Sequence, residues 1–445
     1  MARLINLSAE DSQTAGRLMR NFSWVFSSQA VSGVISIGTL AIMAQSLGPA
    51  GLGLFAIFQA YVRIVDRLLR LEPWQAVIKY GVDALSDDDG DRFMRLLKGS
   101  VYVNLAGSTL AAGVSILAAQ VTARMMGWPE DSAAYLALFS LALLLNLKPT
   151  AVAVLRIFDR FDVLAKVDVG IALMRLVLSA GVWLMGYGLW GFVLVAVIEG
   201  LANSLLPFVY SLRYVHQRGY GKFMQLPIRG IREENPGILR FLWNSNFNVI
   251  IRQTVQRLDV ILLSVLVDEK FVGFFHIARR VADSALKLGR PLNQAIFPEL
   301  ARKWSSGEER GFYKLVNGVL LAIAGLCVVV LVPAAFLMPY VLSVMFGAGF
   351  NEAANMVNVQ LLAVILLLAT MVLNPAMLSM GRDRELLWVT LLGSVMFLAC
   401  FAPLVGMLGP VGASVAHVLF NGTLVAGTLF VLYWSRRQPT VRRPA

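Results

Sequence analysis

The sequence predicts an all-α integral membrane protein with about twelve transmembrane helices in two pseudo-symmetric six-helix bundles. Apolar stretches long enough to cross a bilayer, which needs about 20 residues per helix, repeat along almost the whole chain. Of the 445 residues, 58% are hydrophobic and 15% are charged, whereas soluble domains are nearer ~45–50% apolar and ~25% charged. A short motif of the second stretch recurs in the eighth, which indicates an internal repeat.

The expected spans are separated by turns rich in glycine and proline, such as Gly48-Pro49 and Gly409-Pro410. The spans lie near residues 22–46, 51–79, 95–120, 133–156, 164–186, 189–213, 239–267, 271–298, 313–345, 353–379, 384–406 and 410–434. We therefore expect an N-terminal lobe (1–215), a cytoplasmic linker (216–237), a C-terminal lobe (238–436) and a basic cytoplasmic tail (437–445).

Positive charge alternates between the loops. Basic residues gather around 17–20, 79–98, 156–166, 213–232, 302–314, 382–384 and 436–443, while the other loops carry only Arg124 and Lys270 against five acids. The positive-inside rule then places both termini in the cytoplasm. The same rule explains the net charge of +12, so we expect no nucleic-acid partner.

The internal repeat joins the second and eighth spans. The motif Gly53-Leu54-Phe55-Ala56-Ile57 corresponds to Gly273-Phe274-Phe275-His276-Ile277, and each is followed by Arg residues and by a Gln-Ala pair, at Gln75 and Gln294. This pattern indicates two bundles related by an axis normal to the membrane. Transporters built from such repeats bind substrate near the bilayer midplane.

Several expected spans carry cations in their middle. A cation in hydrocarbon costs roughly 3 kcal/mol or more on insertion scales and by default marks an aqueous or ligand-lined interior. We therefore predict an anionic cavity site, suited to pyrophosphate because the guanidinium is a planar fork of donors. The predicted substrate-binding residues are Arg63, Arg67, Arg252, Arg257, Arg280 and Lys287.

The alternative for these cations is structural ion pairing or snorkelling to an interface. We favour that alternative for Arg70, Arg290 and Lys148. Four acids are candidates either for ion coupling or for pairing: Asp66, Glu199, Asp259 and Asp283. Because the second, seventh and eighth spans hold more cations than acids, pairing alone does not neutralise them.

The chain shows no catalytic motif. It has no Gly-x-x-x-x-Gly-Lys-[Ser/Thr] phosphate loop and no nucleophile elbow, and its two cysteines and three histidines are scattered. We expect no enzymatic activity, no catalytic residue, no metal site and no cofactor.

Several passages resemble a known family. They are Leu47 to Phe55, Leu258 to Leu263 with Val272 to Arg280, Phe297-Pro298, Ser379 to Arg382 and Gly409 to Ala413. They are similar to Wzx-type polysaccharide and O-antigen flippases of the multidrug/oligosaccharidyl-lipid/polysaccharide (MOP) exporter superfamily. The resemblance implies a MATE-like fold, a cationic cavity and alternating access.

The resemblance implies a flippase that moves a polyprenyl-pyrophosphate-linked oligosaccharide from the inner to the outer leaflet of the plasma membrane, for O-antigen, capsule or exopolysaccharide synthesis. The implied partners are this lipid-linked substrate, membrane lipids and a polysaccharide polymerase or assembly complex. Two alternatives stay open: a multidrug or cation exporter of the same fold, and a membrane glycan polymerase or ligase.

Overall fold

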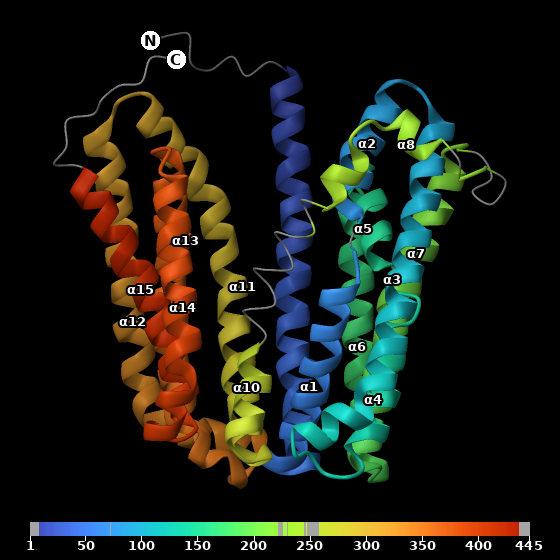
Figure 1. Cartoon of the computed structure of the whole chain (residues 1–445). Coiled ribbons are helices and arrows are strands. Elements are labelled where there is room, and N and C mark those ends of the chain that lie inside the picture. The colour runs from blue at the N-terminus through green and yellow to red at the C-terminus, as the bar shows by residue number, and fades with distance from the viewer. Residues whose placement is uncertain are drawn as a thin grey trace. The chain divides into compact units, whose positions relative to one another are not determined.

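The computed structural model describes residues 9–71, 73–220, 226–228, 230–243, 246 and 258–435 (Figure 1). For residues 9–19, 22, 285, 287–295, 298 and 435 only the backbone is described. All regular elements in these ranges are helices, as expected. The chain divides into two compact units. The first unit comprises Met1–Ser46 with Ile57–Leu258, and the second comprises Leu47–Ala56 with Asp259–Ala445.

The first unit holds most of α1 and the helices that follow it up to α8. Their bounds are α1 (Ala9–Leu69), α2 (Trp74–Ser86), α3 (Gly90–Met125), α4 (Ser132–Ser140), the 3₁₀ helix η1 (Leu141–Leu143), α5 (Lys148–Ile157), α6 (Phe161–Met185), α7 (Gly188–Gln217) and α8 (Ile231–Glu234).

The second unit holds the remaining helices and the segment of α1 from Leu47 to Ala56. The bounds are α10 (Leu258–Leu266), α11 (Glu269–Ser305), α12 (Glu309–Phe346), the 3₁₀ helix η2 (Ala348–Ala353), α13 (Ala354–Ser379), α14 (Asp383–Leu408) and α15 (Val411–Ser435). Helix α13 lies at the centre of this unit and packs against α11, α12 and α15. The lobe boundaries expected from the sequence stay predictions.

Within the described ranges, nine helical stretches are long and apolar enough to cross a membrane. The first of them, Ser23–Leu69, contains two expected spans, because Gly48 adopts a non-helical conformation that kinks α1 between them. The nine stretches thus cover ten of the expected spans. The expected span at 271–298 lies in the more polar α11, and much of the one at 239–267 lies outside the described residues.

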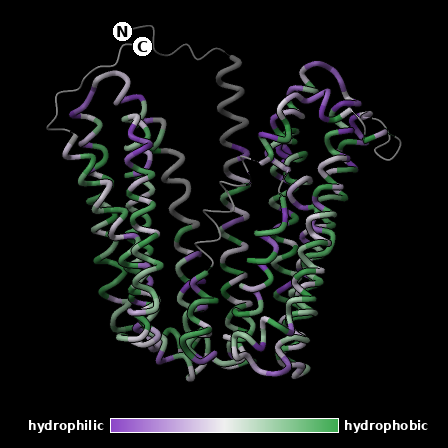
Figure 2. The backbone as a smooth tube through the Cα atoms, viewed as in Figure 1, coloured by the Kyte–Doolittle hydropathy of each residue, from purple (hydrophilic) through white to green (hydrophobic). Residues whose placement is uncertain are grey.

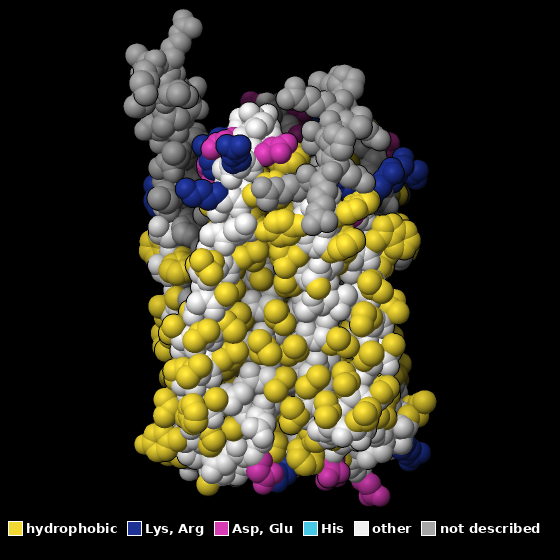
Figure 3. All heavy atoms as spheres, turned by 90° about the vertical axis from the view of Figure 1, so that its left-hand side faces the viewer, with side chains coloured by type: hydrophobic (Ala, Val, Ile, Leu, Met, Phe, Trp, Pro, Cys, Tyr) yellow, Lys and Arg dark blue, Asp and Glu magenta, His cyan; other side chains and the backbone are white. Residues whose placement is uncertain are grey.

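The polar and apolar residues are distributed as a membrane protein requires. Hydrophobic residues fill the middle of the helices and hydrophilic ones gather toward their ends (Figure 2). On the face shown in Figure 3, hydrophobic side chains cover a broad central band, and the charged side chains lie above and below it. The chain is therefore a multi-pass membrane protein.

Two expected spans are interrupted, and proline accounts for both breaks. The span expected at 51–79 leaves the helix after Leu69 and resumes at Trp74, directly after Pro73. The span expected at 133–156 breaks between Leu143 and Lys148, just before Pro149. A proline lacks a backbone N–H, and its ring clashes with the carbonyl four residues earlier. The prediction of continuous helices at these two places was wrong.

The repeated glycines Gly53 and Gly273 make reciprocal contacts within the second unit. A Cβ added to Gly53 would lie 1.8 Å from the carbonyl oxygen of Glu269, and one added to Gly273 would lie 2.1 Å from that of Pro49. Each glycine thus faces the carbonyl group of the residue that lies four positions before the other glycine. The residues that begin the two copies of the motif are therefore a matched helix contact, which only glycine permits.

Replacing Gly273 with alanine should destabilise the fold, because the added methyl group overlaps backbone that cannot move aside. Overpacking of this kind costs about 1–3 kcal/mol or more, so Gly273→Ala should lower the thermal unfolding midpoint of the purified protein by several degrees. The matched control is Gly325→Ala in α12, where a Cβ meets no described heavy atom within 4 Å. Equal midpoints for the two variants would contradict the close contact.

Candidate functional site

The cations predicted on the second span follow one helical stripe of α1. Arg63, Arg67 and Arg70 are spaced four and three residues apart, so they lie on one face and span about 10 Å along the axis. Arg63 is exposed, Arg67 is half-buried and Arg70 is buried. The stripe therefore passes from an accessible position to an enclosed one.

Arg70, at the enclosed end of the stripe, is held by Asp66. The Arg70 Nε donates to Asp66 Oδ1 at 2.8 Å, and Nη2 donates to Oδ2 at 2.9 Å. This two-point pair fixes the guanidinium where α1 ends. The structural pairing expected for Arg70 is confirmed, and Asp66 is its partner.

The break before α5 is stabilised from α7. Leu145 has a positive φ of 57°, which takes the chain out of the helix. The Ser204 hydroxyl accepts from the Leu147 N–H at 2.7 Å and donates to the Leu145 carbonyl. Inside a membrane protein, irregular backbone needs such internal partners, because lipid supplies none.

The ends of both broken helices line a cationic pocket of about 300 Å³ in the first unit, formed by Arg70, Trp74, Asn146, Lys148, Pro149, Val152 and Arg156. Helices α2 and α5 begin at its edge, and neither has a side-chain N-cap. Helix N-termini carry partial positive charge and attract anions. The pocket thus combines three cationic side chains with two helix N-termini.

Two of the three pocket cations are paired with acids. Asp66 holds Arg70, while Lys148 Nζ lies 2.9 Å from Asp168 Oδ1 and 2.9 Å from Asn203 Oδ1. The pairing expected for Lys148 is therefore also confirmed. Arg70 and Lys148 remain protonated in these ion pairs, and the carboxylates hold the two cationic groups in fixed positions.

Arg156 is the third pocket cation and has no acidic partner among the described residues. Its guanidinium carbon lies 5.5 Å from the ring centroid of Trp74. A cation over an indole face is attracted by the ring electrons but keeps its charge. The pocket therefore has a net charge of +1 after pairing. In the sequence Arg156 counted only as part of a basic loop, because the break that places it in α5 beside Trp74 was not predicted.

Glu199 also has a cationic partner in the first unit. Arg175 Nη1 lies 3.3 Å from Glu199 Oε1, and Arg175 is mostly buried. Glu199 was a candidate either for ion coupling or for pairing, and in the structure it forms an ion pair with Arg175.

The second unit contains a separate buried charge cluster. The Asp259 side chain is 2% exposed and forms an ion pair with Arg279 of α11. His417 of α15 lies with Nε2 3.2 Å from Asp259 Oδ2, within ion-pair distance but without hydrogen-bond alignment. Sequence reasoning missed His417, because 158 residues separate it from Asp259 and no local pattern marks it.

The other predicted cavity residues that the structure describes do not line the pocket of the first unit. Arg280 and Asp283 are half-buried on α11. Arg252 and Arg257 lie outside the described residues, and the side chains of Lys287 and Arg290 do as well. The substrate-contacting role of these side chains stays a prediction.

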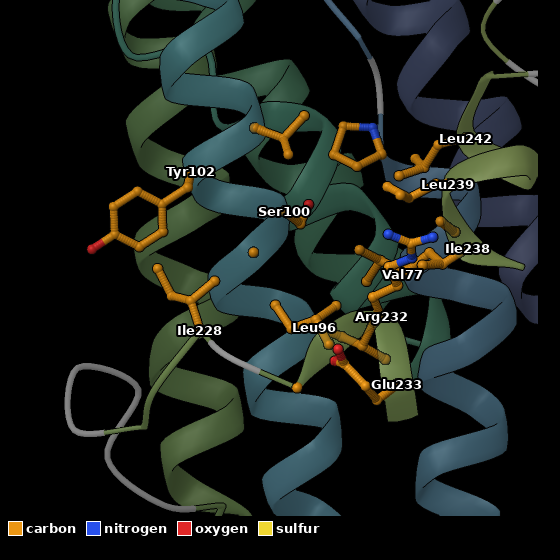
Figure 4. A pocket seen from close by; sticks show the side chains of 16 residues that line it. Val77, Leu96, Ser100, Tyr102, Ile228, Arg232, Glu233, Ile238, Leu239 and Leu242 are labelled. Atoms are coloured by element: carbon orange, nitrogen blue, oxygen red, sulfur yellow. The ribbon is translucent and has the colours of Figure 1, made fainter. Parts of the chain in front are cut away.

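A second pocket in the first unit differs in character. It has a volume of about 370 Å³ and lies where α2, α3 and residues 228 and 230–242 meet (Figure 4). Its walls are mainly apolar, with Val77, Leu96, Ile238 and Leu239 lining it, and Arg232 and Glu233 of α8 lie beside them. This pocket lacks the concentration of cations that distinguishes the one at Arg70.

Comparison with known proteins shows the family to which the chain belongs. The family described as polysaccharide biosynthesis protein matches residues 42–355. The inner membrane protein YghQ of Escherichia coli (strain K12) is 23% identical over 347 residues, which cover 76% of this chain and 95% of YghQ.

Two solved structures share the fold. An inward-facing multidrug resistance MATE family transporter of the MOP superfamily superposes with a TM-score of 0.71 at 13% identity, covering 91% of this chain and 94% of that one. The lipid II flippase MurJ, in an inward closed conformation, superposes with a TM-score of 0.67 at 11% identity, covering 93% and 88%. The predicted MATE-like architecture is confirmed.

Removing the carboxylate that holds Arg70 should destabilise the first unit. Asp66→Ala leaves a buried guanidinium without its two-point acceptor, which we expect to cost about 2 kcal/mol or more. The control is Asp162→Ala, because Asp162 pairs with a more exposed arginine, Arg160, and such pairs contribute about 0–1 kcal/mol. Thermal unfolding of the purified variants measures the difference. A smaller loss for Asp66→Ala than for Asp162→Ala would contradict the assigned role.

Proposed function

Because the chain belongs to the polysaccharide biosynthesis protein family and has the fold of the MOP transporters, we propose that it is a lipid-linked oligosaccharide flippase. It moves a polyprenyl-pyrophosphate-linked oligosaccharide from the inner to the outer leaflet of the plasma membrane. The product supplies a cell-surface polysaccharide such as O-antigen, capsule or exopolysaccharide. The name of the relative YghQ supports an inner-membrane location, and the loop charges support cytoplasmic termini.

The observation that carries this proposal is the cationic pocket of the first unit. A pyrophosphate group carries several negative charges on oxygens that accept hydrogen bonds, and arginine binds such groups through two parallel N–H donors. Arg156 supplies an unneutralised charge, Arg70 and Lys148 supply donors at fixed positions, and the N-termini of α2 and α5 add partial charge. The pocket has the chemistry that this headgroup needs.

The stripe on α1 extends that chemistry away from the pocket. Arg67 and Arg63 follow Arg70 at one and two helical turns, toward the part of α1 that crosses the membrane. In this proposal the headgroup exchanges one cation for the next as it moves, so it is never without a partner in the apolar region. In the second copy of the repeated motif, with Gly273 aligned to Gly53, Lys287 holds the place of Arg67 and Arg290 that of Arg70.

The charge of the site separates this function from export of a cationic drug. A cationic substrate needs acidic partners, and the two acids that contact pocket cations, Asp66 and Asp168, are already paired with Arg70 and Lys148. The MATE transporter that shares the fold is described as a multidrug resistance protein, but fold alone does not transfer a substrate.

The helix connections disfavour a glycan polymerase or ligase. On the side predicted to face outward, α6 ends at Met185 and α7 begins at Gly188, and α14 ends at Leu408 and α15 begins at Val411. Connections of this length have no room for a catalytic domain. The proposal therefore assigns the chain transport alone, with any polymerase as a separate partner.

Deleting the gene tests the function directly. If the chain is the flippase, mass spectrometry of cell lipids should detect an accumulated pyrophosphate-linked oligosaccharide, and a stain for surface polysaccharide should lose its signal. The accumulated lipid would also identify the glycan. An unchanged lipid pool and an unchanged surface glycan, in a strain that carries no second copy of the gene, would overturn the proposal.

Changing Arg156 tests the pocket. Arg156→Gln removes the one unneutralised cation, and losing a hydrogen bond to a charged group costs about 1.5–3 kcal/mol, so polysaccharide export should fall at least about tenfold. Arg156→Lys retains the charge and should lose less. The control is Arg302→Ala, whose side chain is 75% exposed at the end of α11. Wild-type export by a fully inserted Arg156→Gln protein would contradict the role of the pocket.

A further inference from the structure

The apolar pocket of the first unit lies at the level on α3 where charged residues give way to uncharged ones (Figure 4). Charged residues occupy the first turns of α3, and after Lys98 the next one is Arg124. The pocket residues of α3 lie between Leu96 and Val103, so they straddle this boundary. In a helix that crosses a membrane, such a boundary marks the level at which lipid headgroups meet acyl chains. A lipid molecule has the same division into a polar and an apolar end.

Apolar side chains of the pocket are partly exposed. Tyr102 is 49% exposed, Ile228 43% and Leu239 57%. In a membrane protein such side chains contact lipid, and tyrosine is typical of the membrane interface. The pocket volume of about 370 Å³ falls within the range of ligand pockets, about 300–1,000 Å³. The pocket therefore has room for part of an acyl chain from the surrounding bilayer.

The segment that closes the pocket is fixed to α2 and α3 by polar contacts. Four side chains of these helices reach residues 226–228 and 230–242. The contacts are Lys98 Nζ with the Leu226 carbonyl at 2.7 Å, Arg95 with Glu234 at 2.9 Å, Arg92 Nε with Asn235 Oδ1 at 3.1 Å and the Tyr80 hydroxyl with the Pro236 carbonyl at 3.3 Å. Because helix side chains hold this segment at several points, the pocket is a fixed part of the fold.

Two of the side chains that line the pocket are charged, and they have opposite signs. They are Arg232 and Glu233, which are neighbours in α8, and both are exposed. Arg95 nearby already pairs with Glu234, whereas neither Arg232 nor Glu233 forms an ion pair within the described part of the chain. The pocket thus offers a ligand one positive and one negative group beside an apolar space.

We propose that this pocket binds phosphatidylethanolamine of the surrounding membrane. An acyl chain lies between α2, α3 and residues 238–242, with the phosphate at Arg232 and the ammonium at Glu233. The phosphate is an anion that a guanidinium binds, and the primary ammonium donates hydrogen bonds that a carboxylate accepts. Phosphatidylcholine fits less well, because its quaternary ammonium has no N–H to donate. Phosphatidylglycerol has no cation for Glu233.

The bound lipid contacts the start of α2. Pro73 lines the apolar pocket, and the next residue, Trp74, lines the cationic pocket. A chain that fills the apolar pocket removes apolar surface from contact with water, which is favourable. The lipid therefore stabilises the helix whose first residue borders the cationic pocket. This role requires no transported substrate.

Photolabelling locates the lipid on the full-length protein in the absence of any transport substrate. The probe is phosphatidylethanolamine with a diazirine on one acyl chain, incorporated into nanodiscs that contain the protein. Mass spectrometry of the peptides then identifies the labelled residues. We expect label within residues 96–103 or 238–242. Label confined to other parts of the chain would overturn the site.

Competition with unlabelled lipids tests the headgroup. We expect phosphatidylethanolamine to displace the probe about three- to tenfold more effectively than phosphatidylcholine, because a hydrogen bond to a charged group is lost in the latter. Equal displacement by the two would overturn the assignment. Stronger displacement by undecaprenyl phosphate would also overturn it, because the pocket would then bind the chain of a polyprenyl lipid.

Two substitutions separate the contributions of the charges. Arg232→Gln should reduce labelling by every phospholipid probe, because each carries a phosphate, whereas Glu233→Gln should remove only the preference for phosphatidylethanolamine over phosphatidylcholine. Both side chains are exposed, so neither change disturbs the packing. The matched controls are Arg302→Gln and Glu309→Gln, which are exposed in the second unit.

A preference for phosphatidylethanolamine that persists in Glu233→Gln would contradict the proposal. Labelling measures lipid binding alone, and polysaccharide export measures transport. A failure of the lipid site therefore leaves the proposed flippase function to its own test, and a failure of that function leaves the lipid site to this one.

Discussion

Each charge and each interrupted backbone segment inside the membrane must find its partner within the protein, because lipid offers neither charges nor hydrogen bonds. This requirement explains why Arg70 is held by Asp66 through two hydrogen bonds and why Ser204 reaches from α7 to both sides of the break at Leu145. It also explains why Asp259 lies against Arg279. Where the pairing is incomplete, as at Arg156, a ligand of opposite charge has a place to bind.

The same requirement gives the two units different chemistry. In the first unit, breaks in two helices bring their N-termini and three cations to one pocket. In the second unit, Asp259, Arg279 and Gln360 form a buried polar cluster with His417. An accessible pocket with net positive charge suits an anion, whereas the charges of the second cluster are largely paired with one another.

Much of this architecture could be predicted from the sequence. The length and spacing of the apolar stretches gave the helical membrane fold, and the repeated motif marked Gly53 and Gly273, which do contact each other's helices. The pairing of Arg70 with Asp66 also followed from their spacing, whereas the sequence did not single out Asp168 as the partner of Lys148. These features depend on composition and local periodicity, which a single sequence contains.

The site itself could be predicted only in part. The helix breaks at Pro73 and Pro149 were missed, because apolar residues continue across them and proline inside membrane helices is often tolerated. When the helix breaks are not predicted, Arg156 is assigned to a loop. His417 meets Gln360 and Asp259 only through tertiary packing, since 57 residues separate it from Gln360 and it lies far from Asp259 in the chain.

We propose that the pocket at Arg70, Lys148 and Arg156 binds a lipid pyrophosphate. The most direct measurement is a structure, by electron cryomicroscopy in a lipid nanodisc, of the protein with undecaprenyl pyrophosphate. We predict density for the two phosphates within hydrogen-bond distance of these three side chains. Pyrophosphate density bound elsewhere, with this pocket empty, would contradict the account.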